Sequence, residues 1–453
     1  MVDYVFERHL SGGILLPANK TTSTSLPIHR GFVPTKLVLA VHQHRGNAAE
    51  PVVAIGERVL KGQTVAAASA MPSAAVHAGT SGWVRAIEER PVLGGHGVRP
   101  SLTIVIESDG RDERLPDDAA PTWPTDVAAQ RDAIRAGGIV GLGGAVYPTA
   151  DKLATPVPVK TLIINGAECE PYISCDDMLM RENAAEIVAG TLILADVLAA
   201  PRAIIAIERD KPQAMEAIEA AAQAADDARL KLAEVPTIYP AGGEKQLVEL
   251  LTGEEVPSGR YPGEFGYVCQ NVGTAYAVQR LRAQREPLVA RVVTVTGGGV
   301  KKPQNVEVPI GTPIAELIAL CGGYNEGVTR LIAGGSMMGY ALPDDETPIT
   351  KATNCIIAAL ADEVRTDMHE WPCIRCGDCA MVCPSRLLPQ DLLVAATTSD
   401  FAGLHTLGLQ DCIECGCCDV ICPSQILLTE RFRIAKRSVA ARTPIPVTSP
   451  GQD

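Results

Sequence analysis

The sequence has 453 residues, of which 46% are hydrophobic, and a formal net charge of −13. That length allows about two to four domains with cores of their own, and no uninterrupted apolar run reaches the roughly 18 residues that a membrane span needs. The acidic balance makes nucleic acid an unexpected partner, because phosphate binding needs a basic face. The first residues lack the charged-then-apolar pattern of a signal peptide, so we expect a cytoplasmic protein.

The N-terminal region, residues 1–112, shows two strand–turn–strand patterns, at 52–65 and at 76–87. The pair resembles the barrel-sandwich fold of biotinyl and lipoyl carrier domains. Those carriers need a lysine at the tip between the two halves, and here the tip, residues 70–73, has none. We therefore expect a barrel-sandwich scaffold that lacks swinging-arm chemistry.

An α/β pattern occupies residues 127–285, after a Pro- and Asp-rich linker near 115–126. Strand-like runs at 161–164 and 203–207 alternate with Ala-rich helical stretches such as 212–225. Alternation of this kind predicts a sheet with helices packed against it.

The last third of the sequence is expected to hold two smaller domains. A β-rich region at 286–345 opens with the strand-like run 292–296, and a cysteine-rich region covers 360–435 before a basic tail at 436–453. Nine of the 14 cysteines lie between Cys373 and Cys422. Crowding of this kind indicates metal binding rather than disulfides. The expected fold class is multidomain α/β.

Two cysteine motifs repeat the C-x2-C-x2-C-x3-C-P pattern of bacterial ferredoxins, in which the fourth cysteine serves the other cluster. Three closely spaced thiolates can wrap one cubane through a tight loop. The expected ligands are Cys373, Cys376, Cys379 and Cys422 for one 4Fe–4S cluster, and Cys412, Cys415, Cys418 and Cys383 for the other. Zinc is the alternative, but it usually takes four ligands in two separated pairs. Cys417 matches no ligand position, so we expect it beside a cluster.

Four other segments carry residues suited to a nucleotide-like ligand. The glycine-rich stretch 137–152 offers backbone N–H groups to a phosphate and ends in a lysine. It is not a Walker A loop, and a structural turn is the alternative. The acidic segment 165–171 follows a predicted strand, where ligands bind in open α/β sheets, although a solvated loop would look the same. Residues 239–244 and 270–274 are weak signals alone.

Together these four segments resemble the flavin-binding subunit of respiratory complex I. The order of all regions, from the motif at 9–14 to the cysteine motifs, is similar to that of the C subunits of Rnf complexes, which are membrane-bound ferredoxin–NAD oxidoreductases. The resemblance implies an FMN-binding domain at 127–285 and a β-grasp-like SLBB module at 286–345. Three positions depart from the complex I pattern: Leu142 stands in place of an arginine, and Ala167 and Gly243 in place of acidic residues.

The resemblance also implies the roles of single residues. FMN would be held by Gly141, Gly143, Gly144, Lys152, Asn165, Glu168, Gly242, Gly243, Gln270, Asn271 and Thr274. Tyr147 would stack near the nicotinamide of NAD(H), and Glu170 and Glu244 would lie beside it. The residues expected to take part in catalysis are Glu170, Lys152 and Glu244.

The activity implied by the resemblance is electron transfer between NAD(H), FMN and the two clusters, coupled by the complex to ion translocation. The implied partners are the other Rnf subunits, especially the iron–sulfur subunit, and ferredoxin or flavodoxin through the complex. The implied location is peripheral, on the cytoplasmic side of the inner or plasma membrane. A soluble cobalamin reductase of microcompartments and a relay scaffold without flavin are the alternatives. The direction of electron flow and the coupling ion stay open.

Overall fold

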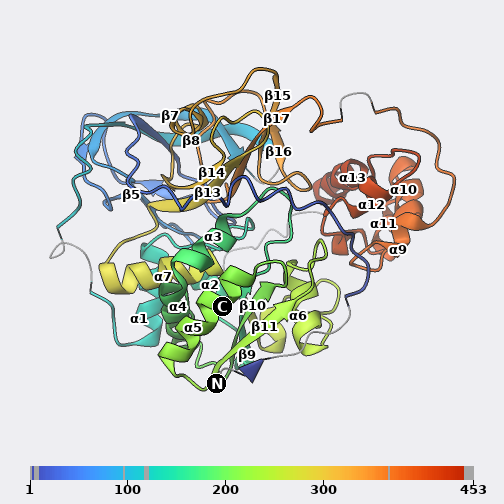
Figure 1. Ribbon diagram of the computed structural model, residues 1–453, viewed down its shortest axis with the longest axis horizontal. Coiled ribbons are helices and arrows are strands. Elements are labelled where there is room, and N and C mark those ends of the chain that lie inside the picture. The colour runs from blue at the N-terminus through green and yellow to red at the C-terminus, as the bar shows by residue number, and fades with distance from the viewer. Residues whose placement is uncertain (1–2, 5–9, 95–96, 117–121, 366–367, 443–453) are drawn as a thin grey trace, which may run out of the picture.

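The computed structural model describes residues 3–4, 10–94, 97–116, 122–365 and 368–442. Figure 1 shows the N-terminal sandwich (blue) and the β-rich domain (orange) packed above the α/β domain (green). The C-terminal helices (red) stand at one side of this body. His9 in the N-terminal motif, part of the predicted linker and the last eleven residues of the predicted tail lie outside the described residues.

The N-terminal domain consists of two antiparallel sheets, as the strand–turn–strand patterns predict. Alternate residues of its strands, such as Leu37, Leu39, Ile104 and Ile106, are fully buried, because successive side chains of a strand point to opposite faces. One sheet has the order β2 (Lys36–Ala40), β8 (Gly97–Ser108), β7 (Gly82–Gly94), β4 (Arg58–Val59). The other has the order β3 (Glu50–Pro51), β5 (Thr64–Ala67), β6 (Val76–His77).

The first residues of the chain do not belong to this sandwich, which corrects the predicted domain 1–112. β1 (Asp3–Tyr4) pairs in parallel with a strand of the α/β domain. Further along, the amide of Gly13 donates to the Val382 carbonyl in the C-terminal domain at 2.9 Å. The N-terminal segment is therefore a strap across other domains. Its partners are distant in sequence, so local periodicity could not indicate them.

The α/β domain is built on a parallel sheet of order β1-β11-β10-β9-β12. Every residue of β10 is buried, because helices cover both faces of a central parallel strand. The strands are β9 (Thr161–Gly166), β10 (Ala203–Glu208), β11 (Leu230–Val235) and β12 (Tyr267–Asn271). The helices are α1 (Val127–Ala136), α2 (Thr149–Lys152), α3 (Cys175–Glu182), α4 (Ala184–Val197), α5 (Pro212–Ala225), α6 (Glu244–Thr252) and α7 (Val272–Gln284), with the 3-10 turn η1 (Pro262–Phe265).

The β-rich domain has the sheet order β14-β13-β17-β15-β16 and one helix, α8 (Ile314–Leu320). Its central strand β17 comes from residues beyond 345, so the predicted end of this domain is too early. The apolar run of β17 is almost wholly buried, and β17 pairs with both β13 and β15. The strands are β13 (Ala290–Thr296), β14 (Gln304–Pro309), β15 (Val328–Ala333), β16 (Tyr340–Leu342) and β17 (Cys355–Leu360).

The C-terminal domain consists of short helices around a small core that includes Leu392, Leu404 and Phe432. Its last helix continues to Arg442, past the predicted boundary at 435, and Lys436 donates to the Cys412 carbonyl at 2.6 Å. The first residues of the predicted tail are therefore part of this domain. The helices are α9 (Asp378–Met381), α10 (Pro389–Thr397), α11 (Phe401–Thr406), α12 (Cys417–Ile421) and α13 (Leu428–Arg442), with the 3-10 turn η2 (Leu409–Asp411).

Candidate functional site

The four segments singled out in the sequence meet at one edge of the parallel sheet. β9 and β12 are parallel neighbours, so the residues that follow them emerge side by side. The side chain of Asn165, at the end of β9, donates to the Gly242 carbonyl at 2.9 Å. Lys152, at the end of the glycine-rich stretch, lies 2.8 Å from a carboxylate oxygen of Glu244. Residues more than 70 positions apart thus form one site.

The glycine-rich loop is closed by its own backbone and fastened to α7. The Gly141 amide donates to the Tyr147 carbonyl at 2.9 Å, and the Leu142 amide donates to the Thr274 hydroxyl at 3.0 Å. Residues 143–145 lie at the exposed tip, and their N–H groups have no hydrogen-bond partner among the described residues. Three neighbouring free amides are suited to an anionic group.

Lys152 is not a freely solvated lysine. Its side chain is 26% exposed, and Glu244 at the start of α6 is its ion-pair partner. Burial opposes the charged ammonium, but the carboxylate of Glu244 outweighs it and raises the pKa of Lys152. Tyr147 stands at the rim of the same site with 38% of its surface exposed. A positively charged group is therefore held beside the loop.

Glu168 caps a helix instead of presenting its carboxylate outward. The side chain is buried and accepts from the amides of Asp176 at 2.9 Å and Asp177 at 3.2 Å, in the first turn of α3. A carboxylate at this end of a helix is stabilised by the helix dipole. The prediction that Glu168 contacts FMN stays untested, and the arrangement gives it a positioning role.

Two other predicted ligands, Asn271 and Asn165, also form hydrogen bonds to neighbouring loops. A third, Gln270, has a side-chain donor without a partner in the described part of the chain. Asn271 caps α7 by accepting from the Gly273 amide at 2.8 Å and donates to Asp176 at 2.6 Å. Asn165 accepts from the Ala167 amide at 3.0 Å. Gln270 differs, because its Nε2 is buried and has no partner among the described residues. A buried donor without a partner at this place is available to a ligand group.

Glu170 ties the α/β domain to the β-rich domain. Its Oε1 accepts from the amides of Met337 at 3.0 Å and Met338 at 2.8 Å, in the loop between β15 and β16. A Cβ added to Gly335 in that loop would lie 2.3 Å from the Glu170 carboxylate, so a larger residue there would displace this side chain. Burial raises the pKa of Glu170. The predicted role of Glu170 beside NADH is untested.

The protonation of Asp176 is expected to make the stability of the folded protein depend on pH. Burial and the neighbouring carboxylate of Glu168 raise the pKa of Asp176 to about 7. Between about pH 4 and about pH 7 the folded protein therefore binds more protons at Asp176 than the unfolded chain, and this group costs stability as the pH rises. We expect Asp176→Asn to raise the melting temperature relative to wild type more at about pH 8 than at about pH 5. Thermal unfolding of both proteins across this pH range checks the prediction. A difference in melting temperature that does not change with pH would contradict it.

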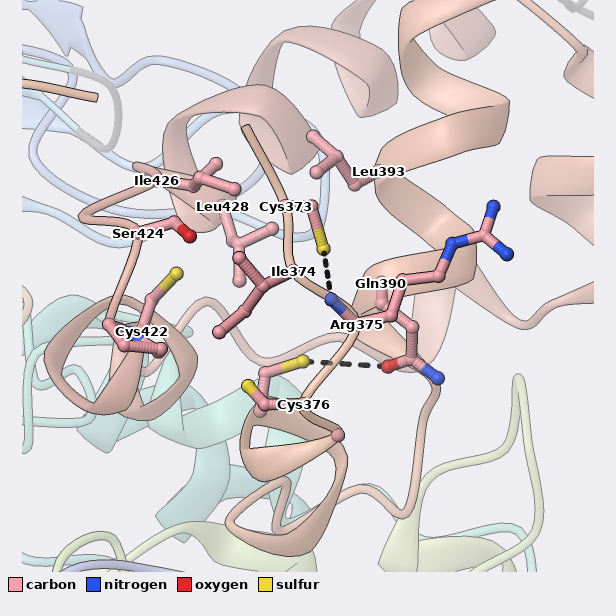
Figure 2. A pocket seen from close by; sticks show the side chains of 13 residues that line it. Cys373, Ile374, Arg375, Cys376, Gln390, Leu393, Cys422, Ser424, Ile426 and Leu428 are labelled. Carbon is pink, nitrogen blue, oxygen red and sulfur yellow. Dashed lines mark hydrogen bonds between the residues drawn. The ribbon is translucent and has the colours of Figure 1, made fainter. Parts of the chain in front are cut away.

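The cysteine motifs form two cavities, each lined by three cysteines of one motif and the fourth of the other. The first cavity, of about 380 Å³ including space open to solvent, is lined by Cys373, Cys376, Cys379 and Cys422. In Figure 2 the sulfur atoms of Cys373, Cys376 and Cys422 face one common space. The second cavity, of about 360 Å³, is lined by Cys383, Cys412, Cys415 and Cys418, with Cys417 beside them. All fourteen cysteines lie in the described residues, and none forms a disulfide.

Residues with positive φ recur at three matching positions of the two cysteine motifs, 39 residues apart. The amides of Arg375 and Leu387 donate to the sulfurs of Cys373 and Cys383, each at 3.4 Å. Residues with positive φ help to turn backbone amides toward one side, which suits an anionic cluster. The left-handed residues come in pairs, Arg375 and Glu414, Gly377 and Gly416, Arg386 and Gln425.

The second cavity is the one that contacts the α/β domain. The hydroxyl of Tyr239 donates to the Cys415 carbonyl at 2.7 Å. Tyr239 lies three residues before Gly242 in the sequence. A Cβ added to Gly12 of the N-terminal strap would lie 2.6 Å from the Cys383 carbonyl, so the strap runs against the backbone of this cavity. Cys373 of the first cavity is exposed. The two cavities therefore differ in position: the second adjoins the four-segment site, and the first is open to solvent.

Family models match three parts of the chain. They are described as the RnfC barrel sandwich hybrid domain at residues 8–111, the Nuo51 FMN-binding domain at 134–280 and the SLBB domain at 292–341. The first and third cover the sandwich and most of the β-rich sheet, and the second contains all four segments of the site.

Curated relatives extend the match to the cysteine motifs. The C subunit of the ion-translocating oxidoreductase complex of Rhodobacter capsulatus is 43% identical over 448 residues, which cover 96% of this chain and 83% of the relative. This chain belongs to the RnfC family. The corresponding C subunits of Pseudomonas aeruginosa and Vibrio cholerae are 46% and 42% identical over 84% and 88% of the chain. The chain spans about half the length of these two relatives, 49% and 52%.

Among solved structures, a more distant neighbour of this RnfC family member is the NAD+-reducing [NiFe]-hydrogenase. Its air-oxidized crystal structure is 23% identical, with a TM-score of 0.49, and the match covers 70% of this chain and 63% of that one. The H2-reduced crystal structure is 22% identical with the same TM-score.

Sequence reasoning missed several residues of this RnfC family member that shape the site. Asp176 was passed over because it follows the acidic segment as an ordinary helix-start aspartate. Arg291 and Lys351 lie far from the glycine-rich loop in sequence, yet both contact its carbonyls. Only the docking of the β-rich domain brings them there, so no local pattern could have indicated them.

Proposed function

We propose that this chain exchanges electrons between NAD(H), an FMN held at the four-segment site and two 4Fe–4S clusters held in the cysteine cavities, as part of an Rnf-type membrane complex. The observation that carries the proposal is the contact of Tyr239 with Cys415, at 2.7 Å, which joins the site to the second cavity. The adjacency of the two sites supports electron transfer between a flavin and a cluster.

The residues present fit FMN. The free amides of 143–145, the buried orphan Nε2 of Gln270 and the ammonium of Lys152 together offer donors to the phosphate, ribityl and ring oxygens. Bound FMN supplies the exchange between a hydride and single electrons, and 4Fe–4S clusters carry single electrons. The chain's own contribution is to hold, orient and shield the flavin, with Lys152 balancing negative charge.

The cavities also support an order of electron transfer. Electrons from the flavin site would reach the second cavity first, because that cavity packs against Tyr239 and the N-terminal strap. The first cavity would be the exit. Two exposed apolar residues, Trp371 and Ile374 at 59% and 67% exposure, flank Cys373 and would contact another component of the complex.

The direct test uses the purified full chain. We expect bound FMN in the visible spectrum and NADH-dependent reduction of an artificial dye. A soluble cobalamin reductase would show the same two signals, so pull-down from membranes with identification of the captured proteins separates the two functions. Purified protein that neither contains nor binds FMN would contradict the proposal and favour a relay scaffold without flavin.

We also propose peripheral attachment to the cytoplasmic face of the membrane through partner subunits. No helix in the described part of the chain is both long and apolar enough to cross a membrane. High-salt or carbonate washing should therefore release the chain from membranes, while an integral protein of the complex, probed on the same blot, stays behind. Retention of the chain after alkaline extraction would contradict this attachment.

A further inference from the structure

Two basic residues are buried beneath the glycine-rich loop without a carboxylate in ion-pair distance among the described residues. Arg291 on β13 is 6% exposed, and Lys351, in the segment before β17, is fully buried. Burial lowers the pKa of Arg291 and lowers that of Lys351 to about 7. Taking a cation out of water costs several kcal/mol unless something offsets it, so their placement calls for an explanation.

Both cations donate to carbonyls of the glycine-rich loop. Arg291 Nη2 lies 3.1 Å from the Leu142 carbonyl oxygen, and Lys351 Nζ lies 2.7 Å from the Gly138 carbonyl oxygen. Lys351 Nζ also donates to the Ala75 carbonyl of the sandwich at 2.7 Å. Arg291 Nη1 donates to the Lys351 carbonyl, so the two residues are linked to each other.

The contact of Arg291 sets the direction of one of the free amides, that of Gly143. In a trans peptide unit the C=O and the next N–H point in opposite directions. The carbonyl of Leu142 is held inward by Arg291, so the Gly143 amide of the same peptide unit points away from the buried guanidinium, toward the exposed tip. The Thr274 hydroxyl fixes the other side of Leu142 by accepting from its amide at 3.0 Å.

Gly138 is confined at the other end of the loop. Its φ is +68°, and an added Cβ would lie 2.4 Å from the Ala75 carbonyl oxygen and 3.1 Å from Lys351 Nζ. The loop therefore lies against the sandwich and the β-rich domain at once. Its geometry depends on the packing of three domains, not on the loop sequence alone.

We propose that Arg291 and Lys351 are positioning residues that hold the glycine-rich loop by its carbonyls: Arg291 directs the free Gly143 amide toward an anionic oxygen of the bound flavin, and Lys351 anchors the loop at Gly138. The inference rests on the proposed function, because it assigns the residues that prepare the FMN site. The positive charge of Arg291 would favour the same anion through the loop. The β-rich domain thereby becomes part of the flavin site without touching the flavin.

The test measures the affinity of the full chain for added FMN and riboflavin after its flavin is removed. We expect Arg291→Gln to weaken FMN binding by about tenfold to a hundredfold, as loss of a charged hydrogen-bonding group does. Arg291→Lys, which keeps the charge, should recover part of the affinity, and guanidinium ion added to Arg291→Ala should do the same. Arg330→Gln, at an exposed position on β15 of the same domain, is the matched control.

The comparison of the two flavins identifies the oxygen that the amides serve. A loss for FMN but not for riboflavin assigns them to the phosphate, whereas an equal loss for both would overturn the anionic target, because oxidised riboflavin carries no anionic oxygen. Lys351→Met, which acts at Gly138, should give the same pattern as Arg291→Gln. Unchanged flavin affinity in both variants would overturn the clamp. It would also be overturned if the variants had a lower melting temperature that guanidinium does not reverse, while their flavin affinity stayed intact. Failure of the wild-type chain to bind either flavin would remove the proposed function and the clamp with it.

Discussion

Replacing Cys415 by alanine is expected to block electron transfer from the flavin site to both clusters, whereas replacing Cys376 is expected to leave the first step intact. Cys415 belongs to the second cavity, which contacts the α/β domain through Tyr239. Cys376 belongs to the exposed first cavity. In Cys376→Ala the remaining cluster adjoins the flavin, and in Cys415→Ala the remaining cluster does not, so the two variants lose opposite ends of one path.

Iron analysis and low-temperature EPR check this expectation. Wild type should contain about eight irons per chain and each variant about four, because each four-cysteine set holds one cubane. Dithionite should reduce the remaining cluster in both variants, which shows that it is intact, and NADH should reduce it rapidly only in Cys376→Ala. Equal rates with NADH in the two variants would contradict the order of the cavities, and about four irons in reconstituted wild type would contradict the two-cluster proposal.

Cys417→Ala is the matched control for these variants. Cys417 lies beside the second cavity, but its sulfur faces the Tyr239 carbonyl at 3.9 Å, and its position in the chain matches no ligand slot of the repeated motif. The variant should keep about eight irons. Loss of one cluster in Cys417→Ala would show that this thiol, rather than one of the predicted four, is a ligand.

The crossed cysteine sets were predictable from the sequence because the information is local. Three of the four ligands of each set lie within seven residues, and the fourth belongs to the other copy of the same motif, so spacing alone restricts the loop. The structure brings together the same two sets of four. Which cavity adjoins the four-segment site was not predictable, since it depends on Tyr239 and Gly12, which precede the motifs by well over a hundred residues.

The flavin segments show where local reasoning stops. Their meeting at one sheet edge follows from parallel strands, which the α/β alternation predicts. The contacts of each side chain cannot be predicted from the local sequence, because they depend on segments that are distant in the chain. Asn271, at the end of β12, reaches Asp176 because β9 and β12 are neighbours, and Asn165 reaches Gly242 in the segment that follows β11. Residues predicted as ligands therefore also hold the loops in place, and their contact with FMN stays a prediction.

The predicted end of the β-rich domain was wrong for a related reason. The central strand β17 lies beyond the predicted end of the β-rich domain, because a short buried apolar run carries no mark of the sheet that it joins. Arg291 and Lys351 look like ordinary basic residues beside strands in the sequence. Their burial comes from the packing of three domains around Gly138, which is a tertiary property.

Lys152→Ala is expected to lower the rate of NADH oxidation by about tenfold to a hundredfold. Lys152 ends the glycine-rich stretch, and its ammonium is held 2.8 Å from Glu244 at the start of α6. A cation at this place would balance the phosphate or the negative charge of reduced flavin. Flavin content, FMN affinity and NADH-driven dye reduction measure the effect, and the cluster spectra should stay unchanged because the cysteine cavities lie in another domain.

A double variant separates a cofactor role of Lys152 from a purely structural one. If the ion pair with Glu244 served only to join α2 to α6, replacing both residues by methionine would restore near-normal function, because an apolar pair can substitute for an ion pair that is only structural. If Lys152 serves the cofactor, Lys152→Met with Glu244→Met stays as weak as Lys152→Met alone, and Lys152→Arg keeps part of the activity. Recovery in the double variant would remove Lys152 from the cofactor site and leave the loop amides and Gln270 to bind the flavin.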